Sequence, residues 1–309
     1  MVIAVLLWST GGLFIKLTSL DAYQVAFFRS FLAGITVLLM TRKNGLRINV
    51  FGIICSLIYA TLLFLFVWAT KHTTAANAIF LQYTAPIYIL VLSPFVIGEK
   101  FHLRDLATVI FCIAGMSLFF VGKLEITDYQ GNAAALCSGI FLGLYIMLLR
   151  HPRATGLPAA AASGVDVGGV DAASADAAVL SSATTTPKPL NPVITVIYGN
   201  FILALATAPQ GIAAIPSLTL KDIFAVSFLG VIQIGIAYIL FIKGVSGGTR
   251  PLDASIIGFI EPLLNPVWVF LFVGEQPSQW AILGGAIIIT TVVIHTLVQY
   301  KKKPPLRTA

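Results

Sequence analysis

The chain has 309 residues, of which 58% are hydrophobic and only 10% are charged. A disordered chain would need low hydrophobicity, and a soluble enzyme would need about a quarter charged residues to cover its surface, so both classes are excluded. The net charge of +7 would indicate nucleic-acid binding in a soluble protein. In so apolar a chain it indicates positive loops beside membrane helices, and we expect no nucleic-acid partner.

Ten apolar runs are each long enough to cross a bilayer, which takes about 20 residues. The runs cover residues 1–20, 22–41, 48–70, 74–97, 103–122, 129–149, 192–210, 221–243, 251–273 and 278–298. They are too long and too unbroken for the strands of a membrane barrel, which alternate over about ten residues. The sequence therefore predicts an all-α polytopic membrane protein with ten transmembrane helices.

The segment 150–191 differs from the rest of the chain. It is rich in Ala, Ser, Gly, Thr and Asp and lacks aromatic residues, which predicts a flexible cytoplasmic linker. The linker divides the chain into residues 1–149, which hold six runs, and residues 192–298, which hold the other four. A basic tail, predicted to be cytoplasmic, follows at residues 299–309.

The basic residues indicate how the chain is oriented in the membrane. With ten spans both termini share one face, and that face with the linker carries 14 of the 19 Lys and Arg residues. The opposite face carries four, and Arg29 lies within a run. Because short cytoplasmic loops are enriched in Lys and Arg, we expect both termini and the linker to be cytoplasmic.

A shift of 176 residues superimposes segment 78–99 on segment 254–275. In both segments a proline, Pro86 or Pro262, is followed twelve residues later by Gly-Glu. The two glutamates, Glu99 and Glu275, end their helices, and we expect them to bond loop amides there.

A weaker match pairs Ser9 in LLWSTGG with Ser138 in ALCSGIF, from the first and the sixth runs. The repeat therefore comprises five helices. Because five is odd, the second copy enters the membrane inverted. Inverted repeats of this kind form two related gates around one central site, as in alternating-access transporters.

These features carry a family resemblance. The opening stretch WSTGGLFIK at residues 8–16 and the paired proline-bearing helices that end in Gly-Glu resemble EamA-type members of the drug/metabolite transporter superfamily. The resemblance covers nearly the whole chain outside residues 150–191, a linker longer than the family usually has. It implies two EamA repeats and a central cavity lined mainly by helices 1, 3, 4, 6, 8 and 9. It also implies small-metabolite or drug substrates, often moved outward, and we expect the plasma membrane of a bacterium or archaeon.

Glu261 lies ten residues into its apolar run. An ionised carboxylate at the bilayer centre costs about 2.5–3.5 kcal/mol on insertion scales, so we expect Glu261 to face away from lipid. Asn265 lies one turn further on, and Pro262 and Pro266 are each expected to break the helix because they lack a backbone donor. Broken backbone is tolerated only against protein or a watered cavity, so this stretch is predicted to face the cavity.

Two roles remain open for Glu261. It could couple protons or anchor a substrate amine, or it could be a structural acid paired with Arg29 or Lys16. Arg29 could itself bind a carboxylate or phosphate group. A structural role is preferred for Arg29, because helix 2 is peripheral in the family that the chain resembles.

Gln82 lies one turn before Pro86. The repeat places Gln82 opposite Gly258 and Ala85 opposite Glu261, so the predicted site is asymmetric. Gln82 could bond the substrate, or it could join helices at about 0.6 kcal/mol per hydrogen bond.

Four further side chains within the runs are candidates for binding: Trp8, Ser9, Tyr145 and Tyr238. Aromatic rings in a cavity can stack on a substrate or bond it through the polar atom at the ring edge. The alternative is that these rings pack the helix bundle or lie in the interfacial belt.

The sequence shows no metal-ligand spacing, phosphate-binding glycine loop or catalytic triad, so we expect no cofactor, no metal and no enzyme activity. Cys55, Cys112 and Cys137 lie in apolar runs and are expected to be buried without a disulfide.

The predicted function is secondary transport of small polar metabolites such as amino acids around a midplane cavity, with export as the expected direction. The expected partners are this solute, membrane lipid and protons, and the sequence leaves a homodimer open. The alternatives are a channel or a scaffold. A lipid-modifying enzyme would require acids, His or Cys clustered at one membrane face, and the sequence shows no such cluster.

Overall fold

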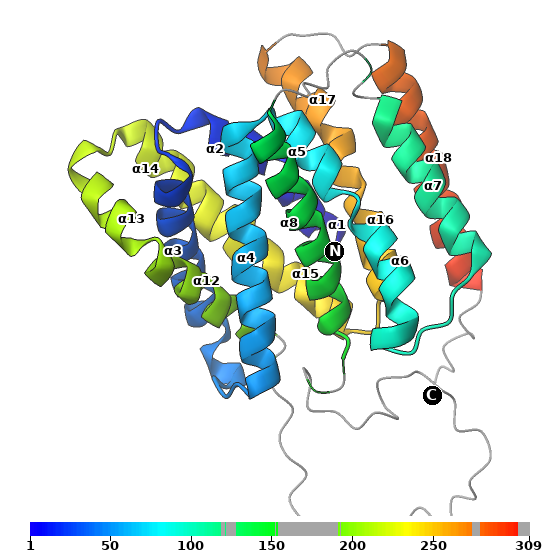
Figure 1. The fold of residues 1–309 in the computed structure, drawn as a ribbon, viewed down its shortest axis with the longest axis horizontal. Helices are drawn as coiled ribbons and strands as arrows, with labels where there is room; N and C mark the ends of the chain where they lie inside the picture. Colours follow the sequence, from blue (N-terminus) through cyan, green and yellow to red (C-terminus); the bar gives the residue numbers. More distant parts are fainter. Residues whose placement is uncertain are drawn as a thin grey trace, which may run out of the picture.

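The computed structural model of the protein describes residues 1–118, 121, 128–151, 153, 191, 193–273 and 279–301. Every regular element within these residues is helical (Figure 1). The first half contains α1 Val2–Trp8, α2 Gly11–Leu17, α3 Ala22–Thr41, η1 Arg42–Asn44, α4 Val50–His72, α5 Ala75–Gln82, α6 Ala85–Val96 and α7 Leu103–Leu118. Then follow α8 Tyr129–Leu148, α12 Ile194–Ala206, α13 Ala208–Ala214, η2 Ile215–Ser217, α14 Leu220–Ser227, η3 Phe228–Ile236, α15 Ala237–Ser246, α16 Pro251–Gly258, α17 Ile260–Val273 and α18 Gln279–Lys301.

Each predicted run contains helix, but the described helices differ in length. Five are long and apolar enough to cross a membrane: Ala22–Asn44, Val50–His72, Asn77–Val96, Tyr129–Leu148 and Leu220–Ser246. Most of the predicted linker 150–191 and of the basic tail 299–309, together with Glu275, lies outside the described residues.

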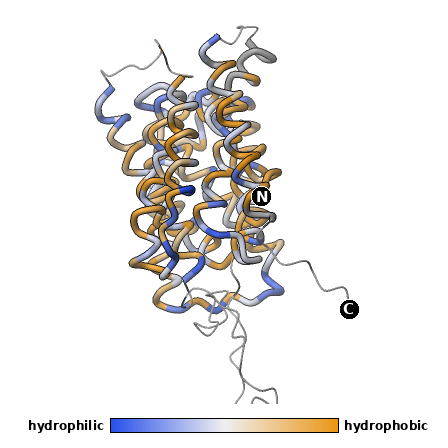
Figure 2. Tube along the Cα trace, turned by 90° about the vertical axis from the view of Figure 1, so that its right-hand side faces the viewer, coloured by the Kyte–Doolittle hydropathy of each residue, from blue (hydrophilic) through white to orange (hydrophobic). Residues whose placement is uncertain are grey.

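The outer surface of the bundle is apolar. Large hydrophobic side chains such as Phe95, Leu205 and Leu220 are almost fully exposed. Figure 2 shows hydrophobic residues along the length of the helices and hydrophilic residues gathered toward their ends. So much exposed apolar surface is what a protein immersed in lipid requires.

The fourth and ninth runs are each interrupted ahead of a proline. A proline clashes with the carbonyl four residues before it and cannot bond to it. Accordingly α5 ends at Gln82, four residues before Pro86, and α16 ends at Gly258, four residues before Pro262. The expected break at Pro266 is not observed, because α17 is continuous from Ile260 to Val273. A proline inside a membrane helix is tolerated where neighbouring groups satisfy the freed carbonyl.

The first run is interrupted between α1 and α2, although it contains no proline. The hydroxyls of Ser9 and Thr10 donate to the carbonyls of Leu6 and Leu7, each at 2.7 Å. Bonds of this kind compete with the helical ladder and bend helices. The glycine pair that follows, Gly11-Gly12, favours helix weakly, so the interruption falls here.

Two runs of the second half also depart from straight α-helix. The helices Ile194–Ala206 and Ala208–Ser217 meet at an angle of 68°, with a proline in the first turn of α13. In the eighth run, the π-helix η3 separates α14 from α15. π-Helical turns are rare and often mark functional sites.

Five helix pairings organise the bundle. α3 packs on both α12 and η3, α4 packs on both α8 and α12, and α7 packs on α18. Figure 1 shows α7 and α18 side by side at one edge. Of the cysteines, Cys55 and Cys112 are buried as expected, whereas Cys137 is exposed.

Candidate functional site

A cavity of about 40 Å³ lies inside the bundle. It is bordered by α1, α3, α4, α5, α8, η3, α15 and α17 and by the α5–α6 junction. Its lining residues are Trp8, Arg29, Leu62, Leu63, Phe66, Gln82, Tyr83, Leu142, Gln233, Ile234, Tyr238 and Glu261. Five of the residues singled out from the sequence therefore line one cavity: Trp8, Arg29, Gln82, Tyr238 and Glu261.

The two interrupted helices meet at this cavity. The hydroxyl of Tyr83, between α5 and α6, donates a 2.7 Å hydrogen bond to the Glu261 carboxylate on α17. The ring of Tyr83 lies 5.4 Å from that of Phe259, its counterpart in the sequence repeat. A Cβ at Gly258 would lie 3.1 Å from the Tyr83 ring, so glycine leaves the room that this approach needs.

Two further hydrogen bonds join the interrupted helices to their neighbours. Gln82 donates to the hydroxyl of Ser138 on α8 at 2.7 Å. Trp268 on α17 donates to the hydroxyl of Ser9 at 2.8 Å. Gln82 thus joins two helices, which is one of its two predicted roles. Ser9 and Ser138, the residues of the weaker sequence match, each accept a bond from an interrupted helix, but the two donors are not equivalent positions of the repeat.

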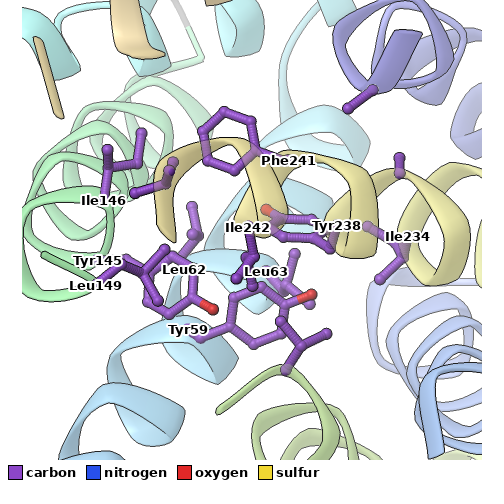
Figure 3. Close-up of a cluster of buried hydrophobic side chains, with 14 of the residues drawn as sticks. Tyr59, Leu62, Leu63, Tyr145, Ile146, Leu149, Ile234, Tyr238, Phe241 and Ile242 are labelled. Carbon is purple, nitrogen blue, oxygen red and sulfur yellow. The ribbon is translucent and has the colours of Figure 1, made fainter. Parts of the chain in front are cut away.

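Aromatic rings border the cavity on one side, and Figure 3 shows Tyr59, Tyr145 and Tyr238 within a cluster of buried hydrophobic side chains. The Tyr238 ring lies 4.7 Å from the ring of Trp8 and 4.9 Å from that of Tyr59. Tyr145 lies behind Tyr59, at 4.9 Å, and its hydroxyl lies 2.9 Å from that of Thr195. Trp8 and Tyr238 therefore border the cavity, whereas Tyr145 supports the wall.

Arg29 lies in the cavity wall, although its helix was expected to be peripheral. Its side chain is 1% exposed and donates to the carbonyl of Leu63 at 3.2 Å. The ion pair with Glu261 that the sequence left open does not form within 4.0 Å in the described part of the chain. Lys16 instead donates to the backbone of Thr73.

Gln233 is a cavity residue that the sequence analysis missed. It lies in the π-helix η3, and its side-chain nitrogen occupies the space where a Cβ at Gly11 would be, at 2.6 Å. A lone amide in an apolar run between Gly230 and Gly235 is the signal that could have indicated it. Asn265 and Pro266 belong to α17, but their side chains lie outside the described residues.

A charged cluster, consisting of Glu99, Asp105, Arg250, Asp253 and His295, joins the end of α6 to α7, α16 and α18. Arg250 lies 2.7 Å from Asp105, 3.6 Å from Glu99 and 3.9 Å from Asp253. The His295 ring lies 2.8 Å from Asp253. Glu99 thus pairs with an arginine, in addition to any contact with loop amides.

Burial acts to lower the pKa of Arg250, but the hydrogen bond that Arg250 donates to Asp105 and the charges of the surrounding acids outweigh burial and raise that pKa. Burial raises the pKa of Glu99, even though Arg250 acts against it. Arg250 therefore stays charged and is the residue that holds the cluster together.

An amide cluster, consisting of Thr73, Asn77 and Asn132, lies at the start of α5. The Thr73 hydroxyl and the Asn77 amide donate to the Asn132 carbonyl oxygen at 3.0 and 3.1 Å. The cluster joins the fourth run to α8 through uncharged side chains, and Lys16 bonds its backbone at 2.9 Å.

Neither cluster is arranged as a metal site. Among the described residues, no group of three His, Cys, Asp or Glu side chains could hold a metal ion. What the cavity offers is a carboxylate, a guanidinium, two amides and aromatic edges, which can bind a polar solute by hydrogen bonds and charge.

Comparison with known proteins agrees with this arrangement. Two proteins of Archaeoglobus fulgidus, each described as an uncharacterized transporter, are 23% and 22% identical to this chain. The matches cover 97% and 95% of this chain and 96% and 93% of the relatives. A crystal structure with 19% identity superimposes with a TM-score of 0.72 over 96% of this chain and 95% of its own, which shows a shared fold.

The model of the EamA-like transporter family matches residues 1–121 and 177–297, which is most of the chain. The resemblance noted in the sequence is therefore confirmed, and the apolar helices agree with an integral membrane protein. This chain belongs to the EamA-like transporter family.

Proposed function

We propose that the protein is a secondary transporter of small polar metabolites such as amino acids. Ten spans, arranged as two inverted five-helix repeats, alternate access to the central cavity, and Glu261 couples transport to protons or holds a substrate amine. Both termini lie in the cytoplasm of a prokaryotic cell. Outward movement is the direction that the family resemblance implies.

The observation that carries this proposal is the bond between Tyr83 and Glu261. It joins the interruptions of two helices that the sequence repeat makes equivalent, inside a cavity lined by polar side chains. Interrupted helices that meet at a repeat interface are the usual substrate and ion sites of secondary transporters.

The helix pairings also support two repeats that are related by a two-fold axis. The repeat exchanges the second run with the seventh and the third with the eighth. Under this exchange the α4–α12 pair becomes the α3–η3 pair, while the α3–α12 and α7–α18 pairs map onto themselves. Such a pattern is expected when two copies are related by a pseudo-two-fold axis.

The test uses purified protein in proteoliposomes. A thermal-shift screen against amino acids, nucleosides and phosphorylated metabolites first selects a solute, which then enters an uptake assay under a pH gradient. We expect Glu261→Gln to express normally and to lose pH-driven uptake, with Asp21→Asn, at an exposed helix cap, as the matched control. Unchanged pH-driven uptake by Glu261→Gln would remove Glu261 from the mechanism.

A counterflow assay separates a carrier from a channel. A carrier that alternates access exchanges labelled for unlabelled solute and saturates, because one site serves both faces. Flux of the selected solute without saturation or counterflow would instead identify a channel. A protein that moves no solute in this assay would be a scaffold.

A further inference from the structure

We propose that Arg29 and Trp8 form an anion subsite in the central cavity, which binds an oxyanion of the transported solute. The proposal rests on the proposed function and adds to it a chemical requirement. The solute must carry a carboxylate or a phosphate group, at a position distinct from whatever binds Glu261.

The first step is the burial of Arg29. Its side chain is 1% exposed and lies two turns into α3, a helix whose apolar length suits a membrane. A charge taken out of water costs several kcal/mol unless it is paired and hydrogen-bonded. No acid lies within 4.0 Å of Arg29 among the described side chains, so none of these side chains serves as the counter-ion of the guanidinium.

The second step is the set of bonds that Arg29 makes. One terminal nitrogen donates to the Leu63 carbonyl at 3.2 Å, which fixes the side chain without neutralising it. The Nε of Arg29 is buried and has no hydrogen-bond partner in the described part of the chain. A guanidinium with an unused donor matches the paired oxygens of a carboxylate or a phosphate.

The third step is that other unused polar atoms surround the same cavity. The indole Nε1 of Trp8 is a buried donor and the side-chain oxygen of Gln233 a buried acceptor, both without a partner among the described residues. Buried polar groups are normally hydrogen-bonded, so unpaired ones gathered at one cavity indicate that something else satisfies them. Two of the three are donors, as an oxyanion requires.

The volume of the cavity shows that part of its wall must move when a solute binds. A cavity of about 40 Å³ exceeds the roughly 10–15 Å³ that one water requires, and it is smaller than a metabolite. A bound solute must therefore displace part of the wall, and the aromatic wall of Trp8 and Tyr238 is the part that also supplies a donor.

The cavity wall carries two groups of opposite charge, Glu261 and Arg29, which can bind different ends of one solute. Glu261 is held by Tyr83 at 2.7 Å, and Arg29 by Leu63 at 3.2 Å, so each charged group has its own support within the cavity wall. A solute with an oxyanion and an ammonium can match both groups. A solute with an oxyanion alone still matches Arg29.

The experiment measures the thermal stability of the purified full-length protein in detergent against four probes. Propionate and inorganic phosphate carry only an oxyanion, ethylamine carries only an amine, and alanine carries a carboxylate and an amine. We expect propionate or phosphate, together with any zwitterion that binds, to stabilise the wild-type protein, and the stronger of the two to identify the oxyanion. Stabilisation by ethylamine alone would overturn the proposal.

The variants locate the effect. We expect Arg29→Gln to weaken the apparent affinity for the stabilising anion by about 10- to 100-fold, the range of one charge-assisted hydrogen bond. Arg29→Lys should recover part of it, because lysine keeps the charge without the planar fork. Arg42→Gln, at an exposed position, is the matched control. A lower melting temperature of Arg29→Gln with unchanged anion affinity would show that Arg29 only supports Leu63.

A second measurement keeps Arg29 intact, in case its variants do not fold. The stabilising anion should change tryptophan emission in the wild-type protein and in Trp68→Phe, and the change should be lost in Trp8→Phe. An unaltered emission change in Trp8→Phe would contradict the subsite. If anion binding fails but saturable counterflow of a neutral or cationic solute persists, the anion subsite is wrong and the transporter function stands.

Discussion

The two interrupted helices, α5–α6 and α16–α17, share a spacing and differ in chemistry. At the interruption, Tyr83 in the first helix corresponds to Phe259 in the second. The second alone carries an acid, Glu261, where the first has Ala85. One break therefore supplies the hydroxyl and the other the carboxylate, and the bond between them exists because the two copies are not identical.

The starts of the same helices differ in a related way. Asn77 and Asp253 are equivalent in the repeat, and so are Thr74 and Arg250. The first helix begins in the amide cluster and the second in the charged cluster. If the repeat is inverted, these starts lie at opposite membrane faces. The start of α5 is then held at one face by neutral hydrogen bonds, and the start of α16 is held at the other face by ion pairs. The stability of the protein should therefore respond differently to a substitution in each cluster.

The largest expected effect comes from Arg250→Gln. Asp105 is 4% exposed at its side chain and would lose its cation, and removing one partner of such a buried pair costs about 3 kcal/mol. The matched control is Thr74→Ala, at the equivalent helix cap, which should cost about 1 kcal/mol. Thermal melts of both variants check the difference. Equal melting temperatures would mean that the charged cluster and the amide cluster stabilise the protein to the same extent.

The second-largest effect is expected for the hydrogen bond between Tyr83 and Glu261, which joins the two interrupted helices. Tyr83→Phe removes the donor to a buried carboxylate, and a hydrogen bond to a charged group contributes about 1.5–3 kcal/mol. Tyr88→Phe, on the same interrupted helix and half-buried, is the control and should change stability little. The melting temperature and the pH dependence of uptake are both measured. A Tyr83→Phe protein that matches Tyr88→Phe in both would show that Tyr83 does not hold Glu261.

The smallest effect tests the equivalence of the two halves. Ser9→Ala and Ser138→Ala each remove the acceptor of one interhelical bond, at about 0.6 kcal/mol per bond in membrane proteins. We expect equal losses that add in the double variant, because the bonds lie on different helix pairs. Ser117→Ala, at a half-buried position on α7 whose hydroxyl bonds only its own helix at Ala114 among the described contacts, serves as the control. Unequal losses would show that the weaker sequence match does not reflect an equivalent role.

Much of the fold could be predicted from the chain alone. Hydrophobic length determined that the runs are helical, because backbone groups in lipid must be satisfied within the helix. The spacing of Pro86 and Pro262 determined where α5 and α16 end, since each proline excludes its partner four residues earlier. The shift of 176 residues makes Tyr83 and Phe259 equivalent positions, and the structure places their rings 5.4 Å apart.

Other features depended on packing between distant segments. Arg29 and Gln233 reach the cavity only because α3 packs against η3, and one sequence carries no signal of which helix faces which. The partner of Glu261 likewise depended on the tertiary structure. Tyr83 lies 178 residues away in the chain, and the sequence left Arg29 and Lys16 open as alternative partners. Local periodicity determines helices and their breaks, whereas the neighbour that satisfies a buried charge is determined by the tertiary structure.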